Sequence, residues 1–325
     1  MMLKTINSMM EKMLPFITPL SVVIGIAFST IFDGFSQLVP WIFAFITFAG
    51  SLNLSFHAFK RALLHPLPIF VVLLLLHLLI PLWAFAVGYL VIREDSFTII
   101  GLVLAVVIPT GVTSFIWVSI HKGNLALALA VILIDTFISP FVVPVSLLVL
   151  AGSAVEIDIW NMMSGLFLMI ILPSILGMLV NEWTRKELKE RIATVLSPFS
   201  KLALSLVVII NSAVVAPYLA NPDKKLILIG LLVFLIASSG YFLSWMSGRL
   251  LKFQQDDIIT LTFTGGMRNI SAGAVLAITY FPPQVAVPVV MGMLFQQILA
   301  SFYGHMLEKV YHPSLAEKKY AANAK

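Results

Sequence analysis

The feature that most constrains this chain is a series of long apolar stretches that recurs along its whole length. Ten can be marked, at residues 15–31, 39–56, 67–90, 97–120, 125–150, 160–180, 202–219, 226–247, 258–280 and 285–307. A helix of ~20 apolar residues crosses the ~30 Å hydrocarbon core of a bilayer. Leucines follow one another within these stretches, whereas the strands of a membrane barrel alternate apolar and polar residues. The sequence therefore predicts an all-α polytopic membrane protein with ten transmembrane helices.

The composition also favours lipid as the solvent. Of the 325 residues, 60% are hydrophobic and 11% are charged, whereas soluble domains average ~45–50% and ~25%. There is no cysteine, which excludes disulfides and thiolate metal ligands. The sequence carries no serine-hydrolase elbow, zinc-protease motif or phosphate loop, so we predict that it is not an enzyme. We expect no cofactor and no metal centre, and a bilayer rather than nucleic acid as the partner.

The basic residues predict the orientation of the chain. Sixteen of the 20 Lys and Arg residues fall on one side of the predicted spans, and only Arg93, Lys224 and Lys225 fall on the other. Cytoplasmic loops of membrane proteins carry the excess of positive charge. We therefore expect a multi-pass protein of the inner (plasma) membrane with both termini in the cytoplasm. The basic segment 182–199 has apolar residues at helical spacing, which predicts a separate interfacial helix.

Two spans contain clusters of residues that break helices. Span four has Pro109 and Gly111 within residues 108–114, and span nine has Gly265 and Gly266 within residues 263–269. The clusters occupy the same span of each five-helix half, and an odd number of helices makes the halves insert in opposite orientations. Paired interrupted helices in inverted halves indicate the binding site of a secondary transporter. We predict that residues 1–155 and 156–325 form two inverted repeats.

Three ionisable residues lie deep within predicted spans: His77 in span three, Asp135 in span five and Arg268 at the break of span nine. Charged groups are costly in a membrane and usually serve function. A structural alternative is that Asp135 and Arg268 merely neutralise each other, and that His77 donates to a backbone carbonyl. The sequence leaves both interpretations open.

Amides and hydroxyls form a second group of candidates. Ser and Thr in membrane helices often bond to their own backbone, so each of these residues is a weak signal alone. The group comprises Thr113, Ser114, Asn211, Ser212, Asn269, Ser271, Gln296 and Gln297.

Several short motifs occur together. They are Gly-Gly-Met-Arg-Asn at 265–269 with Ala-Val-Pro at 286–288, Pro-Thr-Gly at 109–111 ahead of Gly-Asn at 123–124, and Gly-Ser-Leu-Asn-Leu at 50–54 ahead of Phe-Lys-Arg at 59–61. With them, essentially the whole chain resembles the bile acid:sodium symporter family. The resemblance implies a panel domain from spans 1, 2, 6 and 7 and a core domain from spans 3–5 and 8–10. It also implies that spans 4 and 9 cross at their breaks, with two sodium ions at the crossing and an organic anion between panel and core.

The resemblance implies roles for individual residues. Asn269 and Gln297 match amides that contact the substrate, and Ser114 matches a retained serine of the sodium site. The other sodium-site positions differ from the family pattern. The carboxylate and glutamine of span nine fall on Thr264 and Arg268, an asparagine of span four on Phe115, two hydroxyls of span five on Ala128 and Ile132, and a glutamine of span three on His77.

We therefore predict a secondary transporter of a small organic anion, a carboxylate or bile-acid-like, that works by alternating access without sodium coupling. Arg268 would act as a tethered cation with Asp135 as its counter-charge. His77 or Asp135 could carry a coupled proton; otherwise the protein would be a uniporter or exchanger. The alternatives are a sodium-coupled symporter of organic anions and a membrane sensor or scaffold that does not transport.

The predicted site residues fall into two sets. The substrate set is Thr113, Ser114, Arg268, Asn269 and Gln297. The ion or coupling set is His77, Asp135, Thr264, Arg268 and Gln296.

Overall fold

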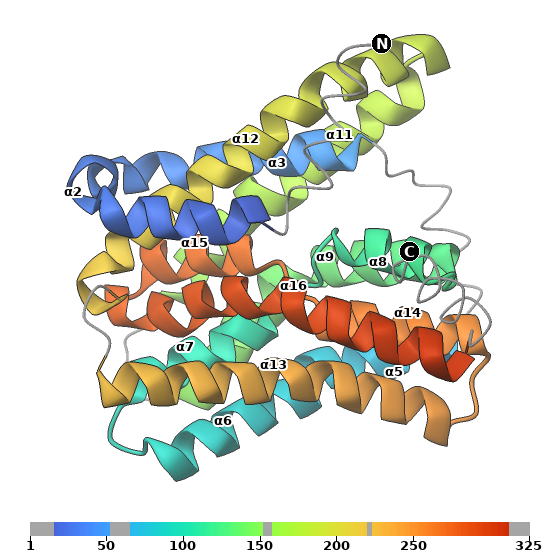
Figure 1. Ribbon diagram of the computed structural model, residues 1–325. Coiled ribbons are helices and arrows are strands. Elements are labelled where there is room, and N and C mark those ends of the chain that lie inside the picture. The colour runs from blue at the N-terminus through green and yellow to red at the C-terminus, as the bar shows by residue number, and fades with distance from the viewer. Residues whose placement is uncertain (1–15, 53–65, 152–157, 220–222, 312–325) are drawn as a thin grey trace, which may run out of the picture.

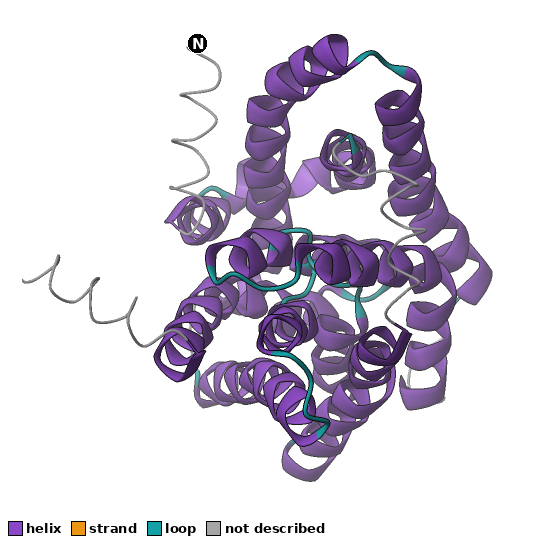
Figure 2. Cartoon of the chain, turned by 90° about the vertical axis from the view of Figure 1, so that its right-hand side faces the viewer, coloured by secondary structure: helices purple, strands orange, loops and turns teal. Residues whose placement is uncertain are grey.

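The computed structural model describes residues 16–52, 66–151, 158–219 and 223–311, and the regular structure in these ranges is helical (Figure 2). Within them, seven helices are long and apolar enough to cross a membrane. Three shorter apolar helices, Phe16–Ala27, Ser96–Val107 and Ile270–Tyr280, fall in predicted spans one, four and nine. The chain is thus an all-helical, multi-pass membrane protein, while the count of ten spans and the inverted repeats stay predictions.

The first half of the chain begins with the helix Phe16–Ala27. It continues with α2 (Ser29–Phe32), the 3-10 helix η1 (Asp33–Leu38), α3 (Val39–Ser51), α5 (Pro66–Leu74), the π-helical turn η2 (Leu75–Leu79), α6 (Ile80–Val91), α7 (Ser96–Val107), α8 (Ser114–Ile120) and α9 (Leu125–Ala151). α5, η2 and α6 follow one another without a gap and form one long helix.

The second half comprises α10 (Ile159–Leu166), the π-helical turn η4 (Phe167–Ile171), α11 (Leu172–Trp183), α12 (Lys186–Leu219), α13 (Lys224–Leu250), α14 (Gln255–Gly266), α15 (Ile270–Tyr280) and α16 (Pro283–Tyr311). The basic segment 182–199 is largely helical, as predicted, and it is not set apart from the seventh predicted span, because α12 runs unbroken from Lys186 to Leu219. The helical spacing of apolar residues in this basic segment continues directly into the seventh predicted span, so the two form one helix.

The helices gather in two groups. Figure 1 shows α2, α3, α11 and α12 together in the upper part of the molecule and α6, α7, α13, α14 and α16 in the lower part. Within the upper group α3 packs against α11 and α12; within the lower group α7 packs against α6 and α16, and α13 against α14. The larger cavity described below lies between the upper group and the two breaks.

Two helices end at the positions where the sequence predicts breaks. α7 ends at Val107, and Ile108 is extended (φ −59°, ψ 152°) because a residue before proline is driven out of the helical region. α14 ends with Gly265-Gly266, and Met267 after it is also extended (φ −94°, ψ 127°). Two glycines in succession weaken the helix by roughly 1 kcal/mol each relative to alanine.

Candidate functional site

The two breaks lie against each other and pair through their main chains. Thr110 and Arg268 form an isolated antiparallel β-bridge. The N–H of Gly111 donates to the carbonyl of Met267 at 3.2 Å, and the N–H of Asn269 donates to the carbonyl of Pro109 at 2.8 Å. Backbone groups at membrane depth must find partners inside the protein. Each break therefore satisfies groups that the other exposes.

Glycine is needed at this crossing because the neighbouring chain comes so close. A Cβ atom on Gly111 would lie 2.8 Å from the carbonyl oxygen of Arg268. A Cβ atom on Gly266 would lie 2.3 Å from the ring of Tyr241, which is fully buried. Only a residue without a side chain allows such an approach.

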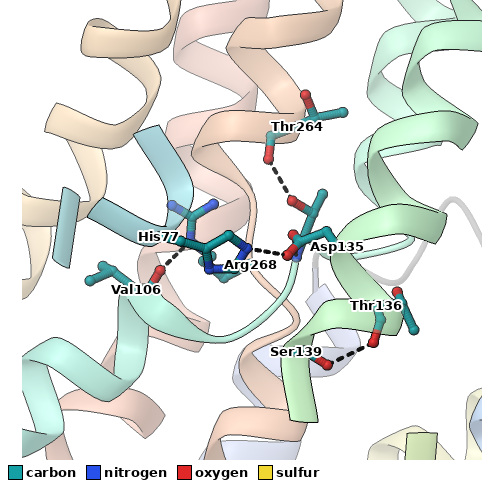
Figure 3. Close-up of polar contacts among 8 residues, drawn as sticks. His77, Val106, Asp135, Thr136, Ser139, Thr264 and Arg268 are labelled. Carbon is teal, nitrogen blue, oxygen red and sulfur yellow. Dashed lines mark hydrogen bonds and ion pairs between the residues drawn. The ribbon is translucent and has the colours of Figure 1, made fainter. Parts of the chain in front are cut away.

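A buried carboxylate connects the first break to a neighbouring helix. Asp135 on α9 is fully buried. Its Oδ1 lies 2.7 Å from Nε2 of His77 (Figure 3). Its Oδ2 accepts the N–H of Thr110 at 2.6 Å. The hydroxyl of Thr110 in turn donates to the carbonyl of Thr264 at 2.9 Å. His77, Asp135 and both breaks thus belong to one hydrogen-bonded chain.

His77 owes its position to a local irregularity of its helix. It lies in the π-helical turn η2, three residues before the start of α6, whose first turn contains Pro81. Proline has no N–H to continue the ladder, and π-helical turns are frequent at functional sites. Nε2 faces Asp135, while Nδ1 is buried without a hydrogen-bond partner among the described residues.

Arg268 is buried with its guanidinium at the end of a half-helix. Its side chain is only 4% exposed, and Nε donates to the carbonyl of Val106 at 2.7 Å (Figure 3). Val106 belongs to the last turn of α7, where free carbonyls carry partial negative charge and favour a cation. The N–H of Arg268 donates to Oε1 of Gln296 at 2.9 Å. Asp135 and Arg268 therefore have different hydrogen-bond partners.

A cavity of about 200 Å³ lies between the breaks and the upper group of helices. Eight predicted residues line it: Pro109, Gly111, Thr113, Arg268, Asn269, Ser271, Gln296 and Gln297. The opposite wall comes from the helix Phe16–Ala27, α3, η4, α11 and α12, and includes Phe43, Thr47, Ser51 and Ser174. The wall is largely apolar, with polar groups concentrated at the breaks.

The side chains of the predicted substrate set make few direct contacts with one another. Asn269 caps α15 by accepting the N–H of Ala272 at 3.3 Å. Gln297 accepts a hydrogen bond from Nε1 of Trp117 at 3.3 Å. Ser114 does not line the cavity; it is fully buried and its hydroxyl has no partner among the described residues.

The remaining predicted residues lie behind the cavity wall. His77, Asp135, Thr264, Gly265 and Gly266 do not line it. The hydroxyl of Thr264 is taken up by its own helix, since it donates to the carbonyl of Thr260 at 2.8 Å. The structure thus divides the predicted residues between a cavity layer and a buried polar layer beneath it.

Comparison with known proteins identifies the family. The model of the sodium bile acid symporter family matches residues 40–222. The chain belongs to this family. The resemblance inferred from the motifs is confirmed, and this symporter-family chain is a membrane transporter rather than an enzyme.

Relatives of this symporter-family chain occur in bacteria and plants. The uncharacterized protein YbaS of Bacillus subtilis is 52% identical over 91% of this chain and 97% of its own length. The uncharacterized sodium-dependent transporter YocS of the same organism is 25% identical over 88% of this chain and 89% of its own length. The probable sodium/metabolite cotransporter BASS2, chloroplastic, of Oryza sativa subsp. japonica is 28% identical over 75% of this chain and 57% of its own length.

Two groups in the site of this symporter-family chain were not among the predicted site residues. Thr110 belongs to the break motif, and its place between proline and glycine was the available signal. The carbonyl of Val106, which holds the guanidinium of Arg268, carries no sequence signal, because every residue has a carbonyl.

Proposed function

We propose that this chain transports a small organic anion across the membrane by alternating access and does not use sodium as the coupling ion. One observation carries the proposal: charges of the protein itself occupy the crossing of the two breaks. The guanidinium of Arg268 is bonded to Val106, and the carboxylate of Asp135 is bonded to His77 and Thr110. A guanidinium keeps its positive charge permanently in proteins, so it can supply there the charge that a bound cation would supply.

The larger cavity supports an anion as the substrate. It is lined by Asn269 and Ser271 at the start of α15, a helix of 11 residues. The N-terminal end of a helix carries partial positive charge and free N–H groups, which favour anions. Gln297 and Thr113 add polar groups next to this helix end, and the opposite wall offers apolar contact. A small carboxylate with an apolar body suits such a lining.

The buried pair of His77 and Asp135 supports a proton as the coupling ion. The atoms Nε2 and Oδ1 are 2.7 Å apart, so a proton can be held between them. Asp135 also accepts the N–H of Thr110 at the first break, so its protonation state acts directly on the crossing. Histidine is the side chain that ordinarily changes charge between pH 5 and 8. If this pair does not take up a proton during transport, the protein is a uniporter or an exchanger.

The proposed mechanism assigns parts to the two groups of helices. The helix Phe16–Ala27 with α2, α3 and α10–α12 forms a panel, and the other helices form a core that carries the breaks. The panel rocks against the core and opens the cavity to either side in turn. The ten spans form inverted repeats over residues 1–155 and 156–325, and both termini face the cytoplasm of the inner (plasma) membrane.

A sodium-coupled symporter is the second candidate function. The names of two relatives favour it, because one is called sodium-dependent and the other a sodium/metabolite cotransporter. Both are less than 30% identical to this chain. Arg268, Thr264 and His77 stand at positions where the family resemblance implies sodium ligands, and on these residues the proposal departs from those relatives.

The test is uptake by purified protein in liposomes. Labelled small carboxylates are offered with an inward proton gradient, an inward sodium gradient, or neither. We expect accumulation with the proton gradient and the same uptake in sodium as in choline. Equilibration without accumulation in either gradient would indicate uniport, and accumulation that requires sodium would establish the second candidate. Empty liposomes and the variant Asp135→Asn serve as controls.

A further inference from the structure

A second, smaller cavity lies beside Arg268, among the helices of the lower group. Its volume is about 30 Å³, and its walls come from α6, α7, α13, α14, α15 and α16 and from the break between α14 and α15. A water molecule needs roughly 10–15 Å³ of such space. The cavity therefore has room for about two water-sized guests, which is too little for a carboxylate with an apolar body. It shares Arg268, Ile270 and Gln296 with the larger cavity.

Arg268 lines this small cavity, and its guanidinium has an unused donor. Arg268 is 4% exposed, and its Nε is taken up by the carbonyl of Val106. Its Nη1 is buried without a hydrogen-bond partner among the described residues. A buried N–H group that lacks an acceptor is costly, and more so when it is charged. A hydrogen-bond acceptor next to Nη1 therefore stabilises the folded protein.

No described residue supplies that acceptor. The carboxylate of Asp135 is the charged group nearest in the hydrogen-bond network, but its two oxygens contact His77 and Thr110. The rest of the small cavity is lined mainly by apolar groups such as Ile80, Leu102 and Ile236. Such walls select a weakly hydrated guest that needs few hydrogen bonds besides the one from the guanidinium.

We propose that the small cavity binds a single halide ion, chloride in the cell, in contact with Nη1 of Arg268. This site is separate from the organic anion in the larger cavity. The proposal does not depend on which ion couples transport. Because the halide lies beside the second break, it stabilises the arrangement of Arg268 that holds the two breaks together.

The first test is thermal unfolding of the purified protein without any organic substrate. Sodium concentration, pH and ionic strength are held constant, and chloride is replaced stepwise by gluconate or by sulfate, which are too large for the cavity. We expect a saturable rise in Tm of about 2–4 °C with chloride. Bromide should act like chloride. Equal Tm values in all of these anions would overturn the proposal.

Two variants fill the small cavity and keep Arg268. A Cβ atom on Gly292 would lie 3.4 Å from Cδ1 of Ile270, and one on Gly240 would lie 3.4 Å from the carbonyl oxygen of Gly265, so alanine fits at both positions. Gly292→Ala and Gly240→Ala should each abolish the rise in Tm with chloride. Gly34→Ala is the matched control, because a Cβ atom there meets nothing within 4 Å, and it should keep the full rise. A chloride effect that persists in both cavity variants would refute this site.

The second test locates the ion directly. Crystals grown in bromide should give an anomalous difference peak next to Nη1 of Arg268, and crystals of Gly292→Ala should lack it. Density for a water at that position, without an anomalous peak at high bromide concentration, would overturn the proposal. Neither test uses an organic acid or a gradient. Failure here therefore leaves the transport proposal untouched, and a failure of uptake leaves this site untouched.

Discussion

At the residue scale, Asp135 has two distinct contacts, one to a titratable ring and one to a main-chain N–H at a break. Asparagine can still accept the N–H of Thr110 but cannot bind a proton. We therefore expect Asp135→Asn to flatten the pH dependence of uptake between pH 5 and 8 and to reduce accumulation by about fivefold or more. Proteoliposome uptake across that pH range measures both effects.

The control for this variant is Asp158→Asn, which removes an exposed carboxylate that caps α10 and lies far along the chain from the breaks. It should leave the pH profile as it is. An unchanged profile in Asp135→Asn would mean that the pair with His77 carries no coupled proton.

A double variant at positions 268 and 264 tests whether this chain has lost the sodium site that the family resemblance implies. The resemblance implies a glutamine and a carboxylate at these positions, so the double variant Arg268→Gln with Thr264→Glu replaces a fixed cation by oxygen ligands. We expect sodium to raise the Tm of this double variant. At a sodium concentration of one hundred times Kd, the gain in the free energy of unfolding is about 2.7 kcal/mol. Thermal unfolding in sodium and in choline measures this rise, with Arg268→Gln alone as the control. A sodium effect that is already present in the unaltered protein would contradict the proposed function.

At the scale of the elements, the close contact between the end of α14 and α13 makes a specific demand on Gly266. A Cβ atom there would lie 2.3 Å from the ring of Tyr241, which is fully buried and cannot swing away. We expect Gly266→Ala to destabilise the protein by about 1–3 kcal/mol, the usual effect of overpacking. Thermal unfolding measures the loss, and Gly34→Ala should show no comparable change. Equal Tm values for the two variants would mean that the two helices can separate without cost.

An ion pair joins the loop before α7 to the start of α13. Nζ of Lys225 lies 2.8 Å from Oδ2 of Asp95, which also caps α7 through the N–H of Thr98. Partial burial of Asp95 acts to raise its pKa, but the hydrogen bonds from Lys225 and Thr98 outweigh this effect, and the pKa of Asp95 is lowered.

A lowered pKa in the folded state sets the direction of the pH dependence. The contribution of Asp95 to stability is present above the unfolded pKa of about 4 and is lost as the pH falls through the lower folded value. The variant Lys225→Gln should therefore have a lower Tm than the unaltered protein at pH 7. Near pH 2 the Tm values of the two proteins should be closer together. Unfolding curves across that range measure the difference. A constant difference between the two proteins at all pH values would contradict this account.

At the scale of the whole molecule, the predicted orientation places the two ends of α13 on opposite sides of the membrane. The chain contains no cysteine, so single cysteines can be introduced without a background. Lys224 and Gln254 are exposed just before and just after the membrane-spanning part of this helix. In intact cells, we expect an impermeant thiol reagent to label Lys224→Cys at once and Gln254→Cys only after the membrane is permeabilised. The reverse pattern would invert the proposed topology.

The sequence was informative where local rules decide the structure. Apolar length marked the helices, and Pro109 and the pair Gly265-Gly266 marked the breaks, because both act on the backbone of their own segment. The contact between His77 and Asp135 could not be predicted, because it joins residues 58 positions apart and depends on how two helices are rotated against each other. The position of the Arg268 side chain could not be predicted either, because its partner is the main-chain carbonyl of Val106.

The β-bridge between the two breaks has a consequence for how such a protein diverges. Because Thr110 and Arg268 pair through their backbones, this pairing does not depend on the identity of their own side chains. Replacing nearby side chains therefore changes the charges at the crossing more readily than it changes the backbone arrangement there. Under the proposed function, one architecture can pass from one driving ion to another through a few substitutions.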